Sequence, residues 1–126
     1  MSKPLDKLTY VDQAEAVIGK LTKKKNGDVK LSTNKIRNLL SLTTELFNMI
    51  DKRSGQLDEK LQSHVQYVRM RMVYEAGRDE DVKEFCEKSE ILEHLKTVGK
   101  DVEKLLLVCH YMEALVAYHK YNTHEK

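Results

Sequence analysis

The sequence YVRMRMVYEAGR occupies residues 67–78, within the longest helical pattern of the chain. At about 100° per residue, Val68, Met72 and Ala76 fall on one side of a helix. An apolar side of this kind is the one that a helix buries against its neighbours. The pattern predicts a helix of roughly 30 Å over residues 57–76. Gly77 is expected to end it in the left-handed conformation.

The opposite side of the same helix alternates aromatic and guanidinium groups. Tyr67, Arg71, Tyr74 and Arg78 fall within a narrow arc, as two pairs spaced i, i+4. Guanidinium groups suit phosphate oxygens, and tyrosine rings suit base or ribose faces, so this arc points to RNA. The same pattern is also typical of solvated residues and of the rim of a protein interface.

The rest of the chain also follows helical periodicity, and patterns of alternating strand residues are nearly absent. The residues expected to cap the other helices are Thr9, Ser32 or Thr33, Asp79, Ser89 and Asp101. A chain of 126 residues fits one domain. We predict an all-α fold, a compact single-domain bundle of about five to six helices over residues 1–126. Residues 1–8 are a candidate for disorder, and residues 22–31 form a basic loop.

Charge is segregated along the chain although the net charge is only +2. Residues 20–37 carry seven cationic side chains and one anionic side chain, whereas residues 79–93 carry seven anionic and two cationic side chains. Such segregation can steer a polyanion to one surface, or let one copy's basic face meet another copy's acidic face. Two solvated helices of unlike composition would give the same pattern.

Motifs of enzymatic chemistry are missing from the sequence. It has no glycine-rich phosphate loop, no His-Glu-x-x-His and no Cys-x-x-Cys. The histidines at 94, 110, 119 and 124 form a ligand set only if a fold is assumed. We therefore expect a protein that is not an enzyme and uses no metal and no cofactor. Cys86 and Cys109 are expected to be buried free thiols, with a disulfide between them as the alternative.

The N-terminus lacks an apolar signal core, and no apolar run approaches the length of a membrane span. We expect a cytoplasmic protein without membrane contact.

A further basic site lies where the second helix begins, because Lys35 and Asn38 share one side of it while Leu39 turns inward. Free amides at a helix N-terminus, together with nearby cations, favour phosphate.

Three blocks together resemble a known family, the small subunit of the type III-A CRISPR effector, or Csm complex. They are Lys35-Ile36-Arg37-Asn38-Leu39-Leu40-Ser41-Leu42, the stretch 67–78, and Tyr111-Met112-Glu113-Ala114-Leu115-Val116-Ala117-Tyr118-His119-Lys120. With the intervals between them they cover roughly residues 31–121. Each block alone is a short helical motif, but their common order and spacing are specific.

This resemblance implies a non-catalytic protein that stacks in several copies along the duplex of crRNA and target RNA. It would bind the duplex backbone without sequence specificity, in antiviral and antiplasmid defence. The implied partners are both RNAs, the repeated backbone subunits, the large polymerase-like subunit and further copies of the chain. The phosphate contacts carried over to this sequence are Lys35, Arg37, Arg69, Arg71 and Arg78, with Tyr67 and Tyr74 supporting the guanidinium groups.

Several points stay open at this level. Arg69 lies near the apolar arc and can instead pair with a carboxylate inside the bundle. The third block, with Ala114, Ala117 and Tyr118, can pack the core or a subunit interface. Two other classes of protein compete with the family assignment: a small helical DNA-binding regulator, and a protein–protein adaptor without RNA contact. About seven residues between the second and third helices argue against the tight turn of a DNA-binding motif.

Overall fold

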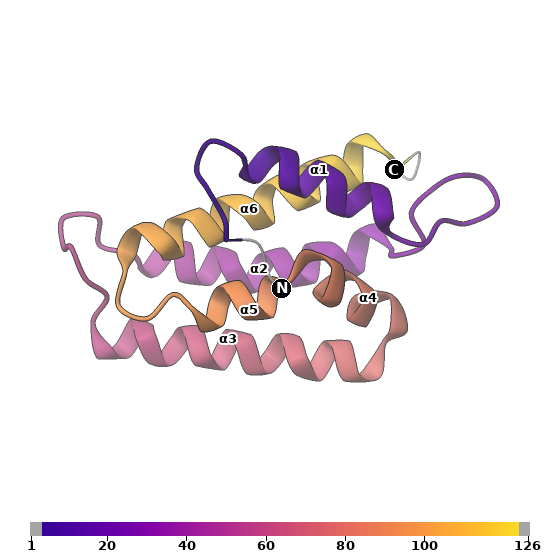
Figure 1. Ribbon diagram of the computed structural model, residues 1–126. Coiled ribbons are helices and arrows are strands. Elements are labelled where there is room, and N and C mark those ends of the chain that lie inside the picture. Colours follow the sequence, from indigo (N-terminus) through magenta and orange to yellow (C-terminus); the bar gives the residue numbers. More distant parts are fainter. Residues whose placement is uncertain (1–3, 124–126) are drawn as a thin grey trace.

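The computed structural model describes residues 4–123 as a bundle of α-helices (Figure 1). The helices are, in chain order, α1 (Tyr10–Lys20), α2 (Thr33–Met49), α3 (Glu59–Arg78), α4 (Glu80–Ser89), α5 (Ile91–Lys96) and α6 (Val102–Tyr121). The described residues contain no β-strand, only two isolated bridges. The predicted all-α fold of five to six helices is confirmed.

The N-terminal prediction of disorder falls partly on residues 1–3, which lie outside the described residues. Leu5 packs against the core, and residues 7–9 form a turn that leads into α1. The amide of Leu8 donates to the carboxylate of Asp6 at 2.7 Å, and the amide of Tyr10 donates to the Asp6 carbonyl at 2.8 Å.

Helix α6 lies at the centre of the core. It packs along α1 and α2 and also contacts α5, whereas α3 packs against α2, α4 and α5 on the other side of the bundle (Figure 1). Helix α6 buries nine of its twenty residues and keeps a polar side, with His110 and Glu113, exposed to solvent. Helix α3 buries only one stripe, made of Leu61, Val65, Val68 and Met72. The exposed side of α3 is therefore free to carry a binding surface.

The third sequence block belongs mainly to this core, and only its exposed positions are left for a subunit interface. Five of its residues are buried, namely Tyr111, Met112, Ala114, Leu115 and His119. The Tyr111 hydroxyl donates to the Ser89 carbonyl at 2.9 Å, and His119 Nε2 lies 2.7 Å from the Leu31 carbonyl oxygen. Ala117 is exposed and Tyr118 is half-buried.

Both cysteines are buried and free, as predicted, and no disulfide joins them. Burial raises the pKa of the Cys86 thiol and that of the Cys109 thiol to about 12 each. The nucleophilic thiolate form is therefore scarce at neutral pH.

Three of the six described helices, α2, α4 and α6, begin with the side-chain cap that the sequence predicts. Ser32 accepts the Lys35 amide, and Asp101 accepts the Lys104 amide at 3.2 Å. Asp79 accepts two amides of α4, those of Asp81 and Val82. Thr9 precedes α1 but its side chain makes no capping hydrogen bond.

The predicted cap at Ser89 is wrong. Ser89 is the last residue of α4, and Glu90 precedes α5 in the left-handed conformation with φ of 57°. This left-handed turn ends α4 and starts α5 at once, because the Glu90 amide donates to Cys86 and its carbonyl accepts from His94. The Ser89 hydroxyl still accepts the Ile91 amide at 3.3 Å.

The predicted stop at Gly77 is also wrong, because α3 continues to Arg78. Gly77 has no positive φ, unlike Gly27 and Gly99. The chain leaves α3 through extended backbone at Asp79, with φ of −148° and ψ of 116°, because Asp79 already caps the next helix. A left-handed residue is not needed at this junction.

Replacing Gly77 with Ala is expected to stabilise the protein by up to about 1 kcal/mol, because Ala favours helix and an added Cβ meets nothing within 4 Å. The matched control is Gly99→Ala, which has equal space but a φ of +57° and should destabilise. Urea denaturation measures both. A loss of stability in Gly77→Ala would mean that α3 ends at this glycine.

Candidate nucleic-acid interface

Tyrosine and arginine side chains contact one another along the exposed side of α3. Arg71 Nη1 donates to the Tyr67 hydroxyl at 3.3 Å, and Arg71 Nη2 lies 3.8 Å from a Glu75 carboxylate oxygen. The hydrogen bond to Tyr67 and the nearby Glu75 carboxylate raise the pKa of Arg71. The guanidinium group of Arg71 is therefore held in place and stays charged.

Arg78, seven residues further along α3, is likewise placed between a tyrosine and Glu75. Its guanidinium carbon lies 5.7 Å from the centre of the Tyr74 ring, within the range of a cation–π contact. Its Nη1 lies 3.8 Å from the other oxygen of Glu75. Glu75 thus stands between both arginines, a role that the sequence analysis missed although its i+4 and i−3 spacing to them is visible. We call Tyr67, Arg71, Tyr74, Glu75 and Arg78 the Tyr–Arg face.

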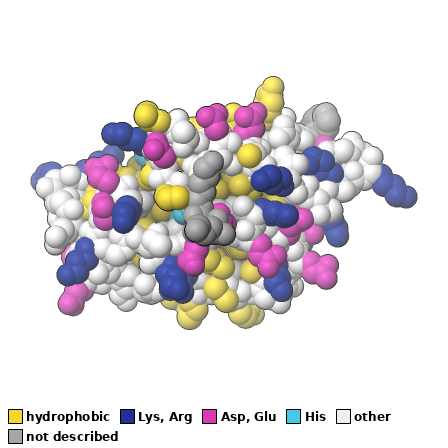
Figure 2. Space-filling model, in the orientation of Figure 1, with side chains coloured by type: hydrophobic (Ala, Val, Ile, Leu, Met, Phe, Trp, Pro, Cys, Tyr) yellow, Lys and Arg dark blue, Asp and Glu magenta, His cyan; other side chains and the backbone are white. Residues whose placement is uncertain are grey.

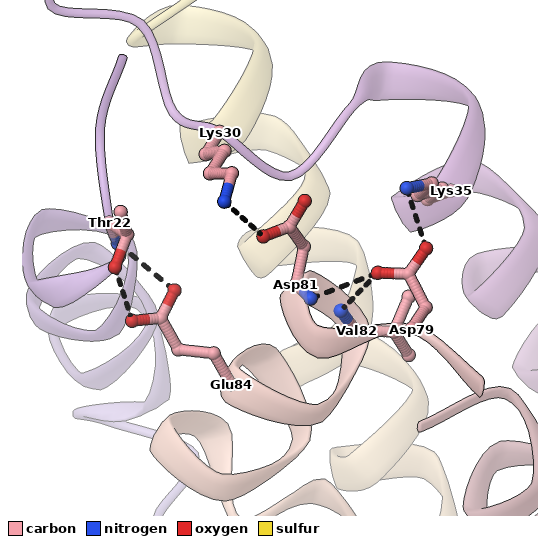
Figure 3. A network of polar contacts seen from close by, with 7 residues as sticks. All are labelled: Thr22, Lys30, Lys35, Asp79, Asp81, Val82 and Glu84. Carbon is pink, nitrogen blue, oxygen red and sulfur yellow. Dashed lines mark hydrogen bonds and ion pairs between the residues drawn. The ribbon is translucent and has the colours of Figure 1, made fainter. Parts of the chain in front are cut away.

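Lys35 lies beside one end of the Tyr–Arg face and is held by a carboxylate. Lys35 Nζ is 2.5 Å from Asp79 Oδ2, while the other oxygen of Asp79 caps α4 (Figure 3). The hydrogen bond between them raises the pKa of Lys35 and lowers the pKa of Asp79. Lys35, Asn38 and Arg78 line one pocket of about 300 Å³ between α2 and α3.

The other two predicted phosphate contacts lie apart from this group. Arg37 is exposed, but it follows Lys35 by two residues and so points about 200° away around α2. Arg69 is half-buried on a different flank of α3, and its Nη1 donates to the Gln66 side-chain oxygen at 3.0 Å. Its partner within residues 4–123 is this amide and not a carboxylate.

The segregated charges of the sequence meet within the chain. Glu84 of α4 accepts hydrogen bonds from the Thr22 amide at 3.0 Å and the Thr22 hydroxyl at 2.7 Å (Figure 3). Lys30 pairs with Asp81 at 3.7 Å, next to the pair of Lys35 and Asp79. The first turns of acidic helix α4 are therefore tied to the segment before α2 and to the start of α2, by two ion pairs and by hydrogen bonds to Thr22.

Metal-binding clusters are not found among residues 4–123, where no three His, Cys, Asp or Glu side chains gather as ligands. His94 is buried edge-on against the Tyr111 ring, and this burial lowers its pKa, so it is held neutral. His124 lies outside the described residues.

None of the described helices has the length and apolar content required to cross a bilayer.

Comparison with known proteins identifies relatives over most of the chain. A model of the family described as Csm2 Type III-A matches residues 6–125. A Mycobacterium tuberculosis protein (strain CDC 1551 / Oshkosh) named CRISPR system Cms protein Csm2 is 46% identical over 113 residues, 89% of this chain and 90% of the relative. A Streptococcus thermophilus protein of the same name is 47% identical over 112 residues, 89% of each chain. The protein of that name from Enterococcus italicus is 34% identical over 94 residues, 72% of this chain and 67% of the relative.

Two substitutions of Asp79 separate its two roles. Asp79→Asn keeps a good helix cap but loses the charge that holds Lys35, whereas Asp79→Ala loses both and should be less stable than Asp79→Asn by about 1 kcal/mol. The contribution of the ion pair is the difference in free energy of unfolding between wild type and Asp79→Asn. We expect this difference to be present at pH 7. Urea denaturation across pH measures it.

The pH dependence of this difference follows from both pKa directions. Because folding lowers the pKa of Asp79, the stabilisation is present above the unfolded value of about 3.9 and is lost as pH falls below it. Because folding raises the pKa of Lys35, the stabilisation is lost only as pH rises above about 10.4. A difference that stays unchanged down to pH 2 would contradict the ion pair.

Proposed function

The chain belongs to the Csm2 type III-A family, and from this membership we propose that it is the non-catalytic small subunit of a type III-A CRISPR effector. Several copies stack along the duplex of crRNA and target RNA and bind its backbone without sequence specificity. Other Csm subunits and further copies of the chain are its protein partners. The complex acts in the cytoplasm in defence against viruses and plasmids.

The Tyr–Arg face is the observation that carries this proposal. Its two guanidinium groups, with side chains 43% and 63% exposed, lie on the same side of one helix and are each supported by a tyrosine. Glu75 lies 3.8 Å from each of them, longer than the 2.7–2.9 Å typical of a charge-assisted hydrogen bond. The guanidinium forks therefore keep donors for phosphate oxygens, and phosphate contacts carry no base information.

The five proposed contacts have unequal support. Arg71 and Arg78 form the centre of the surface, and Lys35 extends it because it lines the same pocket as Arg78. A phosphate near Lys35 would compete with the carboxylate of Asp79. Arg37 and Arg69 face other directions, so they contact RNA only if the nucleic acid, or a second strand, reaches those flanks.

A protein–protein adaptor is the second candidate, because α3 also exposes aliphatic surface. The side chains of Met70 and Val73 are 57% and 52% exposed on the same helix as the Tyr–Arg face. Apolar residues gathered in this way are typical of interaction sites. A DNA-binding regulator has less support, since residues 50–58 separate α2 from α3 and the tight turn of a helix-turn-helix needs three or four residues.

Replacing Arg71 and Arg78 together with Ala is expected to weaken RNA binding equally for RNAs of unrelated sequence. Each lost phosphate contact should also lower the slope of log K against log salt by roughly 0.7–0.9. Fluorescence anisotropy with labelled RNAs at several salt concentrations measures both effects.

Arg53→Ala with Lys52→Ala is the matched control, because it also removes two cations and both residues are exposed in the loop between α2 and α3, outside the Tyr–Arg face. The conservative pair Arg71→Lys and Arg78→Lys keeps the charges and tests the guanidinium fork. Unchanged RNA affinity in the double Ala variant, with a folded chain, would reject the Tyr–Arg face as the RNA contact and favour the adaptor.

A further inference from the structure

A groove of about 490 Å³ lies between α3 and the α4–α5 pair, on the side of α3 away from α2. Its floor is apolar, formed by Val73, Ala76, Cys86 and Leu92. Next to it Met70 and Val73 are exposed, and Figure 2 shows hydrophobic side chains along the lower edge of the molecule, where Figure 1 places α3. A surface of this kind is suited to a partner that brings apolar atoms.

The rim of the groove is acidic. Three glutamates border it, Glu87, Glu90 and Glu93, against the single cation Lys83. Within residues 4–123 none of the three glutamates forms an ion pair, in contrast to the carboxylates in the first half of α4. An acidic rim repels nucleic acid and attracts a cationic occupant. Lysine fits both features, because its four-carbon stem packs on apolar surface while its ammonium group reaches a carboxylate.

The same chain carries a matching cationic projection. Residues 22–31 extend from the bundle as a narrow loop (Figure 1), closed by a bridge between Lys23 and Val29. The Lys24 amide donates to the Asp28 carbonyl at 2.8 Å, and Gly27 holds the turn with φ of 92°. These backbone hydrogen bonds order the loop before any partner arrives.

The lysines at the tip of this loop are available for contact. Lys23 turns back and donates to the carbonyls of Gly19 and Leu21, at 2.9 and 3.1 Å. Lys24 and Lys25 are exposed and make no ion pair within the described part of the chain. Neither belongs to the Tyr–Arg face. The groove of the same chain is lined by residues of α3, α4 and α5 and by Glu90 between the last two, so the loop does not occupy its own groove.

We propose that the groove between α3 and α4–α5 binds the Lys24–Lys25 tip of a second copy of the chain. The lysine stems lie on the apolar floor and their ammonium groups meet the glutamate rim. The contact joins two different surfaces, so it repeats from copy to copy and builds an open row. This inference rests on the proposed function, which places several copies in a row along an RNA duplex. It identifies the two surfaces through which neighbouring copies contact each other.

Reversing either half of the contact should separate the copies. One variant carries Lys24→Glu and Lys25→Glu, and the other carries Glu87→Lys and Glu93→Lys. Sedimentation velocity of the full chain at low and moderate salt should show each variant associating at least about tenfold more weakly than wild type, because like charges then face each other. Lys60→Glu with Lys100→Glu is the control for the loop variant, and Glu15→Lys with Glu45→Lys is the control for the groove variant; each makes the same change in net charge at exposed sites elsewhere.

Mixing the two variants provides the decisive test. Each reversed loop then finds a reversed groove on the other variant, so the equimolar mixture should regain association that neither variant has alone. Failure of the mixture to recover, or an equal loss in the Lys60 and Lys100 control, overturns the proposal. Circular dichroism confirms that each variant is folded, as expected for substitutions at exposed residues.

Disulfide trapping detects the contact even if it is weak. A chain with both Lys24→Cys and Glu90→Cys should form a ladder of cross-linked multimers, whereas each single variant should stop at a dimer or remain single. The native cysteines are buried and do not interfere. A wild-type chain that stays monomeric in sedimentation at millimolar concentration, together with no ladder, overturns the proposal.

RNA binding distinguishes this inference from the proposed function. The loop and groove variants should bind RNA as well as their charge-matched controls do. Loss of RNA binding in the loop variant, with self-association unchanged, would make the loop an RNA contact and reject this inference alone. Unchanged RNA binding after loss of Arg71 and Arg78, with copies still joined, would reject the RNA interface and leave this contact standing.

Discussion

The carboxylate of Asp79 is the contact on which the arrangement of the candidate RNA surface depends. One oxygen accepts two backbone amides and starts α4, and the other holds Lys35 at the start of α2. A single residue therefore joins the end of α3, the start of α4 and the start of α2. This junction places Arg78 and Lys35 in the lining of one pocket although they are far apart in the sequence.

Burial divides the remaining helices into those that hold the fold and those that offer a surface. Helix α6 buries more residues than any other helix, so the third family block, which lies within it, serves chiefly to pack the core. Helix α3 buries one stripe and exposes the rest, including the Tyr–Arg face and the aliphatic residues next to the acidic groove. One amphipathic helix can thus face RNA on one flank and a protein on the other.

The uneven charge of the chain has two separate consequences. Most of the carboxylates in the first half of α4 are used internally, where they hold the basic segment before α2. Those in the second half of α4 and in α5 surround an apolar groove and stay unpaired within the described residues. Lys24 and Lys25, at the tip of the 22–31 loop, likewise form no ion pair within the described residues. Complementary charges that find no partner within one chain are available for contacts between chains.

Periodicity and capping residues were sufficient to predict six helices, because a helix is built from contacts three and four residues apart. The Tyr–Arg contacts were predictable for the same reason, since all of their members lie on α3. Other features could not be predicted from the sequence. They are the ion pair between Lys35 and Asp79, the separation of Arg37 from that pair, and the left-handed turn at Glu90. These features depend on how helices distant in the sequence pack together and on the backbone conformation where one helix ends and the next begins. A pattern of neighbouring residues does not encode the distance between separate helices.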